Sequence, residues 1–162
     1  MIRRMTGWMA GLLAAGLCSA ATTVSVSGPP SIRTGSPAAL TVTLAGSAGQ
    51  GIVVLQWGLA LPAGASYGTP VLASRLTGSI VCAASICQLR TTAALTDGTL
   101  ATIPLTFGGA AGPVSLAVNG ISAAQAQGYY VDGVGAGPAY TTYVVALSQV
   151  PAAVTGLAAR VP

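Results

Sequence analysis

The chain has 162 residues, of which 52% are hydrophobic and only 5% charged, and its formal net charge is +4. Charged residues usually make up about 25% of a globular protein, so this surface carries little charge repulsion between neighbouring molecules. The few positive charges form no basic stripe along the sequence. We therefore exclude a nucleic acid as the partner.

The first twenty residues have the form of an export signal. Arg3 and Arg4 precede an apolar run over residues 8–17, and small residues follow it. A basic start, an apolar run of about ten residues and a small-residue cleavage site are typical of a secretory signal peptide. We expect cleavage after Ala20, or alternatively after Ala21, and a bacterial protein that is secreted or displayed at the cell surface.

Two other fates of this segment stay open. One is a retained membrane anchor, although a spanning helix needs about 20 apolar residues. The other is a lipoprotein, because Cys18 follows the apolar run, although Leu17 stands where such signals favour a small residue. Without residues 1–20 the chain has no Lys, Glu or His, and four Arg and two Asp leave a charge of +2. No second apolar run could cross a membrane.

The rest of the sequence predicts short strands, because polar and apolar residues alternate with period two. Residues 52–59 are the most apolar segment, which favours a central strand. In residues 100–107 the alternation puts Ile103, Leu105 and Phe107 on one face, and Pro104 indicates an edge strand or a bulge. The predicted strands cover residues 23–26, 39–44, 52–59, 71–72, two short runs around the cysteines, 100–107, 114–118, 129–131 and 140–147.

Turn signals separate these strands. Asp97-Gly98 and Asn119-Gly120 are dipeptides typical of tight turns. Residues 108–113 and 133–138 are rich in glycine and predict loops, and residues 122–127 could form one helical turn. Together the pattern predicts an all-β fold, a single antiparallel β-sandwich of jelly-roll type with about nine strands. The domain is expected over residues 21–148, followed by a flexible tail or linker over 149–162.

The two cysteines of the mature chain, Cys82 and Cys87, predict a disulfide, since an exported protein meets an oxidising environment. Two short β-prone runs flank the residues between them, so the bridge would close a hairpin. In the chain-entropy model so small a loop gains only about 2 kcal/mol. Two cysteines without a histidine do not complete a metal site, and we expect no metal and no cofactor.

The composition also argues against catalysis. Without His, Lys or Glu, the carboxyl groups of Asp97 and Asp132 are the remaining acid–base groups of the mature chain. A glycosidase could use such a pair, but both residues fit turns better. The sequence therefore predicts a protein that is not an enzyme.

Aromatic side chains are the best candidates for recognition, because they can stack on sugar rings or anchor a protein partner. Tyr129 and Tyr130 are consecutive, so in a strand they face opposite sides and one is exposed. Tyr140 and Trp57 complete the set of possible binding aromatics. Packing in the core is the alternative role for each of them, and for Trp57 in particular.

The order of the strands resembles the cohesin family and related carbohydrate-binding sandwiches of secreted bacterial proteins. Residues 35–44 (GSPAALTVTL) look like the family's early strand, and residues 52–59 (IVVLQWGL) look like its long inner strand. Residues 95–107 (LTDGTLATIPLTF) are similar to the family's segment of Asp-Gly and alternating apolar residues that ends in Phe. The resemblance covers residues 21–147.

This resemblance implies a nine-strand jelly roll, an extracellular setting and a protein partner, the dockerin module, within polysaccharide-degrading assemblies. Cohesins that hold dockerins usually show Asn or Asp near the end of the long inner strand. This chain has GLAL at residues 58–61 instead. The resemblance therefore implies the fold, and leaves dockerin binding as an open expectation.

Two functions follow as hypotheses. The first is a non-catalytic module that binds a protein or polysaccharide partner at the cell surface. The second is a structural subunit of an extracellular filament or surface layer, since low charge and open strand edges favour self-association.

Overall fold

The computed structural model describes residues 21–146. In this range no helix is long and apolar enough to cross a membrane. The predicted signal peptide and the tail over residues 149–162 lie outside the described residues, as does the end of the last predicted strand. The strands are β1 (Thr22–Ser27), β2 (Ser31–Arg33), β3 (Pro37–Ala45), β4 (Ile52–Leu59), β5 (Ala65–Tyr67), β6 (Val71–Leu72), β7 (Gly78–Ala83), β8 (Ile86–Thr91), β9 (Gly98–Phe107), β10 (Gly112–Leu116), β11 (Val118–Gln125), β12 (Val134–Ala136) and β13 (Tyr140–Val145).

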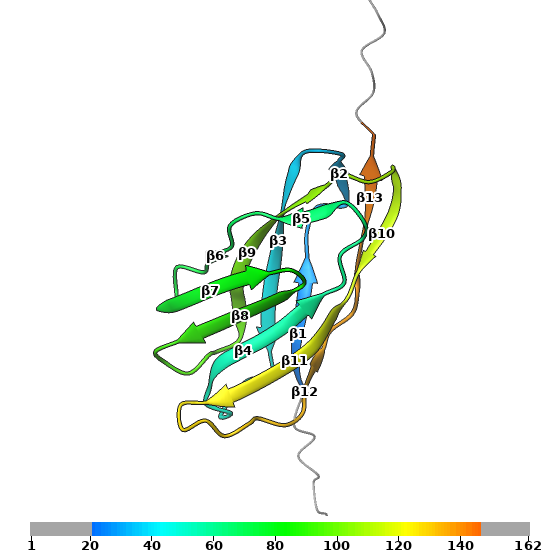
Figure 1. The fold of residues 1–162 in the computed structure, drawn as a ribbon. Helices are drawn as coiled ribbons and strands as arrows, with labels where there is room; N and C mark the ends of the chain where they lie inside the picture. The colour runs from blue at the N-terminus through cyan, green and yellow to red at the C-terminus, as the bar shows by residue number, and fades with distance from the viewer. Residues whose placement is uncertain (1–20, 147–162) are drawn as a thin grey trace, which may run out of the picture.

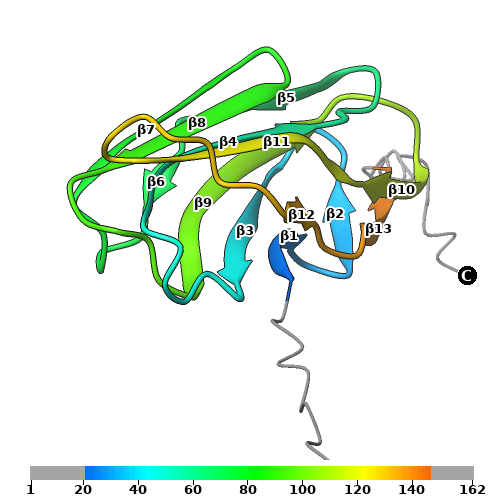
Figure 2. The same cartoon turned by 90° about the horizontal axis from the view of Figure 1, so that it is seen from below.

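The strands form two layers (Figures 1 and 2). One layer is a four-stranded sheet in the order β11-β4-β8-β7. The other contains the order β12-β1-β3-β9-β5, with β6 also paired to β9, and a small sheet β10-β13-β2 beside it. The neighbouring strands pair mostly in antiparallel fashion, and β12 and β2 add parallel pairs. The predicted all-β sandwich is confirmed.

Alternating apolar residues build the core between the layers. In β3 the side chains of Leu40, Val42 and Leu44 are buried, as the period-two pattern predicted. The same alternation buries the inward side chains of β4 and β9. The largest fully buried side chains are Trp57, Leu40, Leu44, Ile52, Leu55, Leu59, Leu89, Leu100, Ile103, Leu105, Leu116 and Val24. This shared apolar layer holds the two sheets together.

The prediction of a central strand over residues 52–59 is also confirmed. The strand β4 has these bounds and lies between β11 and β8. Its side chains point alternately into the core, as at Leu55 and Trp57, and outward, as at Val54 and Gln56. Because β4 is paired on both sides, it fixes the position of every outward residue of its sheet.

Three predictions between residues 114 and 138 were wrong. The alternation at 114–118 is not one strand, because β10 ends at Leu116 and β11 begins at Val118 in the other layer. Asn119-Gly120 is an irregularity within β11, where the register shifts and Gly120 has φ +54°, and not a hairpin turn. Residues 122–125 continue β11 without a helical turn, and the glycine-rich segment at 133–138 contains β12.

Pro104 lies in an interior strand and not at an edge. The strand β9 pairs with β3 on one side and with β5 and β6 on the other. The carbonyl of Pro104 accepts a hydrogen bond from Gly68 N (2.7 Å), in the gap between β5 and β6. The N–H and C=O of one residue in a strand point to the same side, so the missing proline donor faces this gap. The proline therefore interrupts no continuous ladder.

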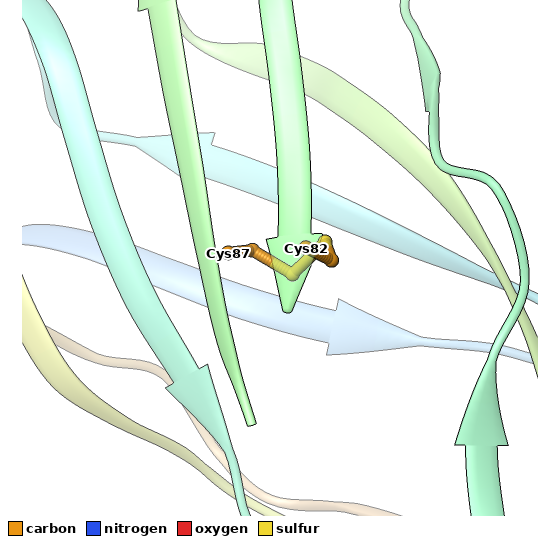
Figure 3. The surroundings of a disulfide bond; sticks show 2 residues. All are labelled: Cys82 and Cys87. Atoms are coloured by element: carbon orange, nitrogen blue, oxygen red, sulfur yellow. A yellow bond between two sulfur atoms is a disulfide. The ribbon is translucent and has the colours of Figure 1, made fainter. Parts of the chain in front are cut away.

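The predicted disulfide between Cys82 and Cys87 is confirmed and joins the neighbouring strands β7 and β8 (Figure 3). The hairpin closes at the pair Ala83 and Ile86, which leaves a two-residue loop. In this loop Ala84 has φ +54°, a left-handed conformation that costs a side chain roughly 1–2 kcal/mol.

We expect Ala84→Gly to stabilise the protein by about 0.5–1 kcal/mol, because glycine adopts positive φ without steric cost. The matched control is Ala83→Gly in β7, where φ is not positive. That change should destabilise the protein by about 0.5–1 kcal/mol. Urea unfolding of the oxidised protein measures both, and equal effects of the two changes would contradict the expected strain.

A carboxylate ties one end of the sandwich together. Asp97, just before β9, accepts hydrogen bonds from Ser47 Oγ (2.6 Å), Ser47 N (2.8 Å) and Gly46 N (3.0 Å) in the loop after β3. These bonds, first of all the one from the Ser47 hydroxyl, lower the pKa of Asp97 below its ordinary value of 3.8. Asp97 is thus a structural residue, which agrees with its predicted role near a turn.

We expect Asp97→Asn to destabilise the protein at neutral pH. The folded pKa is lower than the unfolded one, so the stabilisation is present above pH 3.8 and is lost as the pH falls through the folded value. Thermal unfolding across this range should show the wild type and the variant converging in acid. The control is Asp132→Asn, and a variant that loses as much stability at low pH as at neutral pH would contradict this account.

Candidate functional site

The outward side of the β11-β4-β8-β7 sheet presents one continuous face. Residues paired across antiparallel strands have their side chains on the same side, so the registers define which residues share it. We call this surface the front face. Its three rows are Ala124, Val54, Arg90 and Ser79; then Ser122, Gln56, Gln88 and Val81; then Asn119, Gly58, Ile86 and Ala83. The sheet lies at the front of the molecule in Figure 1.

Apolar side chains are unusually exposed on the front face. Val81 is 63% exposed and Ile86 50% exposed, on β7 and β8. At the opposite side of the sheet an isolated bridge pairs Tyr130 with Ala124, which adds Tyr130, at 81% exposure, to the first row. A surface on which apolar side chains lie among polar ones fits the composition of protein-binding surfaces.

Polar groups between these apolar residues are mostly amides. Gln56 and Gln88 face one another across β4 and β8. Arg90 is the one charged residue in the three rows, and its Nε donates a hydrogen bond to Gln88 Oε1 (3.3 Å). The front face is therefore nearly neutral, with a single cation and several groups that can both donate and accept hydrogen bonds.

Asn119 covers the end of β4. Gly58 pairs with Asn119 of β11, and the Asn119 side-chain oxygen occupies the place that a Cβ at position 58 would take. An amide thus stands on the front face at the end of the long inner strand, although β4 itself has no polar side chain there. The sequence comparison at residues 58–61 missed it because the residue comes from the neighbouring strand.

The sequence-predicted aromatics lie in different places. Tyr129 (70% exposed) and Tyr130 are on the surface, and only Tyr130 joins the front face through its pairing. The Tyr140 hydroxyl donates a hydrogen bond to the Pro29 carbonyl, so it fastens the start of β13 to the chain before β2. Trp57 is fully buried, and as a surface contact it is a wrong prediction. Its parity in β4 points the indole ring into the core.

The front face also contains residues that the sequence analysis did not single out, namely Val81, Ile86 and Asn119. For the first two a signal was present. Val81 is out of phase with Ile80 and Cys82, and Ile86 is out of phase with Cys87, so each faces away from the core. Among residues 21–146 no group of three or more His, Cys, Asp or Glu side chains could hold a metal ion.

The described fold is similar to solved cohesin structures. It aligns with a cohesin module from a Clostridium perfringens family 33 glycoside hydrolase at a TM-score of 0.64 and 10% identity, over 78% of this chain and 98% of that chain. It aligns with the CaDoc0917–CaCohA2 complex at a TM-score of 0.60 and 14% identity, over 76% of this chain and 100% of that chain. The fold is cohesin-like.

A third cohesin-like match is a non-cellulosomal cohesin from the archaeon Archaeoglobus fulgidus, at a TM-score of 0.54 and 12% identity over 76% of this chain and 91% of that chain. No protein-family model matches the sequence, and no curated protein does. The resemblance expected from the three sequence segments is therefore confirmed at the level of the fold.

We expect the two aromatics to separate stability from surface function. Trp57→Ala should cost roughly 3–5 kcal/mol of unfolding free energy, because it leaves a large cavity in the core. Tyr130→Ala should change the stability by no more than about 0.5 kcal/mol, since its side chain lies in solvent. Chemical denaturation checks both values, and a large loss for Tyr130→Ala would place that ring in the core instead.

Proposed function

We propose that this protein is a non-catalytic, cohesin-like module that binds a protein partner through the front face. The observation that carries this proposal is the nearly neutral surface in which Val81, Ile86 and Tyr130 stand exposed among amides. Burial of apolar side chains drives association, and the surrounding amides give direction to the contacts. A flat sheet face of this kind suits a partner with a firm surface of its own.

The cohesin-like fold supports this function. One of the similar structures is a complex, CaDoc0917–CaCohA2, and the cohesin resemblance implies a dockerin module as partner. The amide of Asn119 over Gly58 supplies a polar group near the end of the long inner strand. This position removes the main sequence-based objection to a dockerin, so we propose a dockerin-like protein as the partner.

The same proposal includes the setting. The signal-peptide pattern at residues 1–20 supports export from a bacterial cell, and the disulfide between Cys82 and Cys87 supports an oxidising compartment. The near absence of acid–base side chains supports a binding role without catalysis. A polysaccharide partner is less favoured, because a single aromatic ring, Tyr130, stands on the front face.

Calorimetric titration of the mature protein against a panel of dockerin modules tests this function. We expect one or more modules to bind, and Ile86→Lys to weaken that binding by roughly 100-fold, because it puts a charge among desolvated contacts. The matched control is Tyr143→Lys, which changes an exposed side chain on β13, outside the front-face sheet.

Two results would contradict the proposal. Equal weakening by Ile86→Lys and Tyr143→Lys would move the binding surface away from the front face. Retention on insoluble polysaccharide, without binding to any dockerin, would replace the protein partner by a glycan.

A further inference from the structure

The strand β7 ends its sheet with an unprotected edge. It pairs with β8 on one side and with no strand on the other. Natural edge strands are usually guarded by charged residues, proline or a bulge. The sequence of β7, GSIVCA, has neither charge nor proline, and its register with β8 is regular throughout. The edge is therefore a template for another strand.

The hydrogen-bond pattern shows which groups are free. The Cα atoms of Cys82 and Cys87 are 4.0 Å apart, which is the short spacing of a non-hydrogen-bonded pair. The pattern alternates, so Ile80 and Gly78 are of the same kind. Thr92 N donates to Thr77 O (3.0 Å), which agrees with this parity. The N–H and C=O groups of Gly78, Ile80 and Cys82 thus point away from β8.

A groove runs along this edge. It has a volume of about 460 Å³ and lies between residues 67–70 of the opposite layer and residues 80–82 of β7. The Tyr67 hydroxyl is buried there without a hydrogen-bond partner among the described residues, and burial raises its pKa to about 12. A polar atom that is cut off from water and unpaired marks a place that lacks its occupant.

We propose that β7 pairs with β7 of a second copy of this chain, antiparallel and about a two-fold axis at Ile80. This pairing goes beyond the proposed function and uses the strand's edge, where the partner site uses the sheet's face. In this register Ile80 lies opposite Ile80 of the second copy, and Gly78 opposite Cys82. All three outward residues of each strand then form ladder bonds, so the contact is self-complementary, as a two-fold interface must be.

Charge complementarity favours a second copy over other occupants. The strand has no charge, and the mature chain has only four Arg and two Asp, so two copies meet without repulsion. Val81, 63% exposed, lies opposite Ser79 of the second copy and is shielded in the pair. An extended strand is the one structure that satisfies a row of alternating donors and acceptors, and β7 offers that row to its own copy in matching order.

Sedimentation of the mature, oxidised protein over a range of concentrations tests the pairing. We expect a reversible dimer, and Val81→Lys should weaken it at least about tenfold, because lysines at an edge oppose strand addition. The matched control is Ile86→Lys, an equally exposed position of the front face on the interior strand β8. It should leave the dimer intact while it removes dockerin binding, so the two proposals fail separately.

Hydrogen exchange gives a residue-level readout. On dimerisation the amides of Gly78, Ile80 and Cys82 should become protected, whereas those of Ser79 and Val81 bond to β8 and stay protected at every concentration. A protein that remains monomeric up to about 1 mM overturns the proposal. So does unchanged exchange at the three outward amides, or equal weakening of the dimer by Val81→Lys and Ile86→Lys.

Discussion

The burial of one apolar layer between two sheets is the constraint from which the other features follow. Leu55, Trp57 and Leu59 of β4 enter this layer, and the pleat sends the residues between them to the opposite side. A shift of one residue would exchange the two sets, so the core fixes the register of β4 and of its neighbours. The front face is therefore positioned by the core and needs no support of its own.

The scarcity of charge shapes the surface that this core leaves outside. On the front face hydrogen-bonding capacity comes from amides and hydroxyls, with Arg90 as the one cation of its three rows. Such a surface keeps water-soluble groups while it lowers the cost of desolvation, since neutral amides lose less on burial than ions do. Recognition then depends on shape and on a few apolar contacts more than on long-range attraction.

Alternation made the strands predictable where each strand stays in one sheet. The segments 39–44, 52–59 and 100–107 show this, and the spacing of the cysteines correctly indicated the hairpin. Prediction was wrong where alternation continues while the strand changes layer, as at Leu116 and Val118, because both residues face the same core. It was also wrong at Asn119-Gly120, since a dipeptide cannot distinguish a turn from an irregular strand.

The candidate site was less predictable because it depends on pairing between distant segments. Nothing local tells that Asn119 fills the space beside Gly58, since the two residues meet only once β11 lies against β4. The exposure of Val81 and Ile86 follows from parity, but their position in one surface follows from register. Tyr130 joins them through a single bridge to Ala124.

The interruption at Pro104 has a consequence for the size of any assembly. The margin opposite β7 in the other layer consists of β5 and β6, which are three and two residues long and are separated where Gly68 meets the proline carbonyl. So short and broken a margin is a poor template, and molecules that met there would gain few bonds. Growth on this flank would stop at a closed pair and would not extend into a fibre.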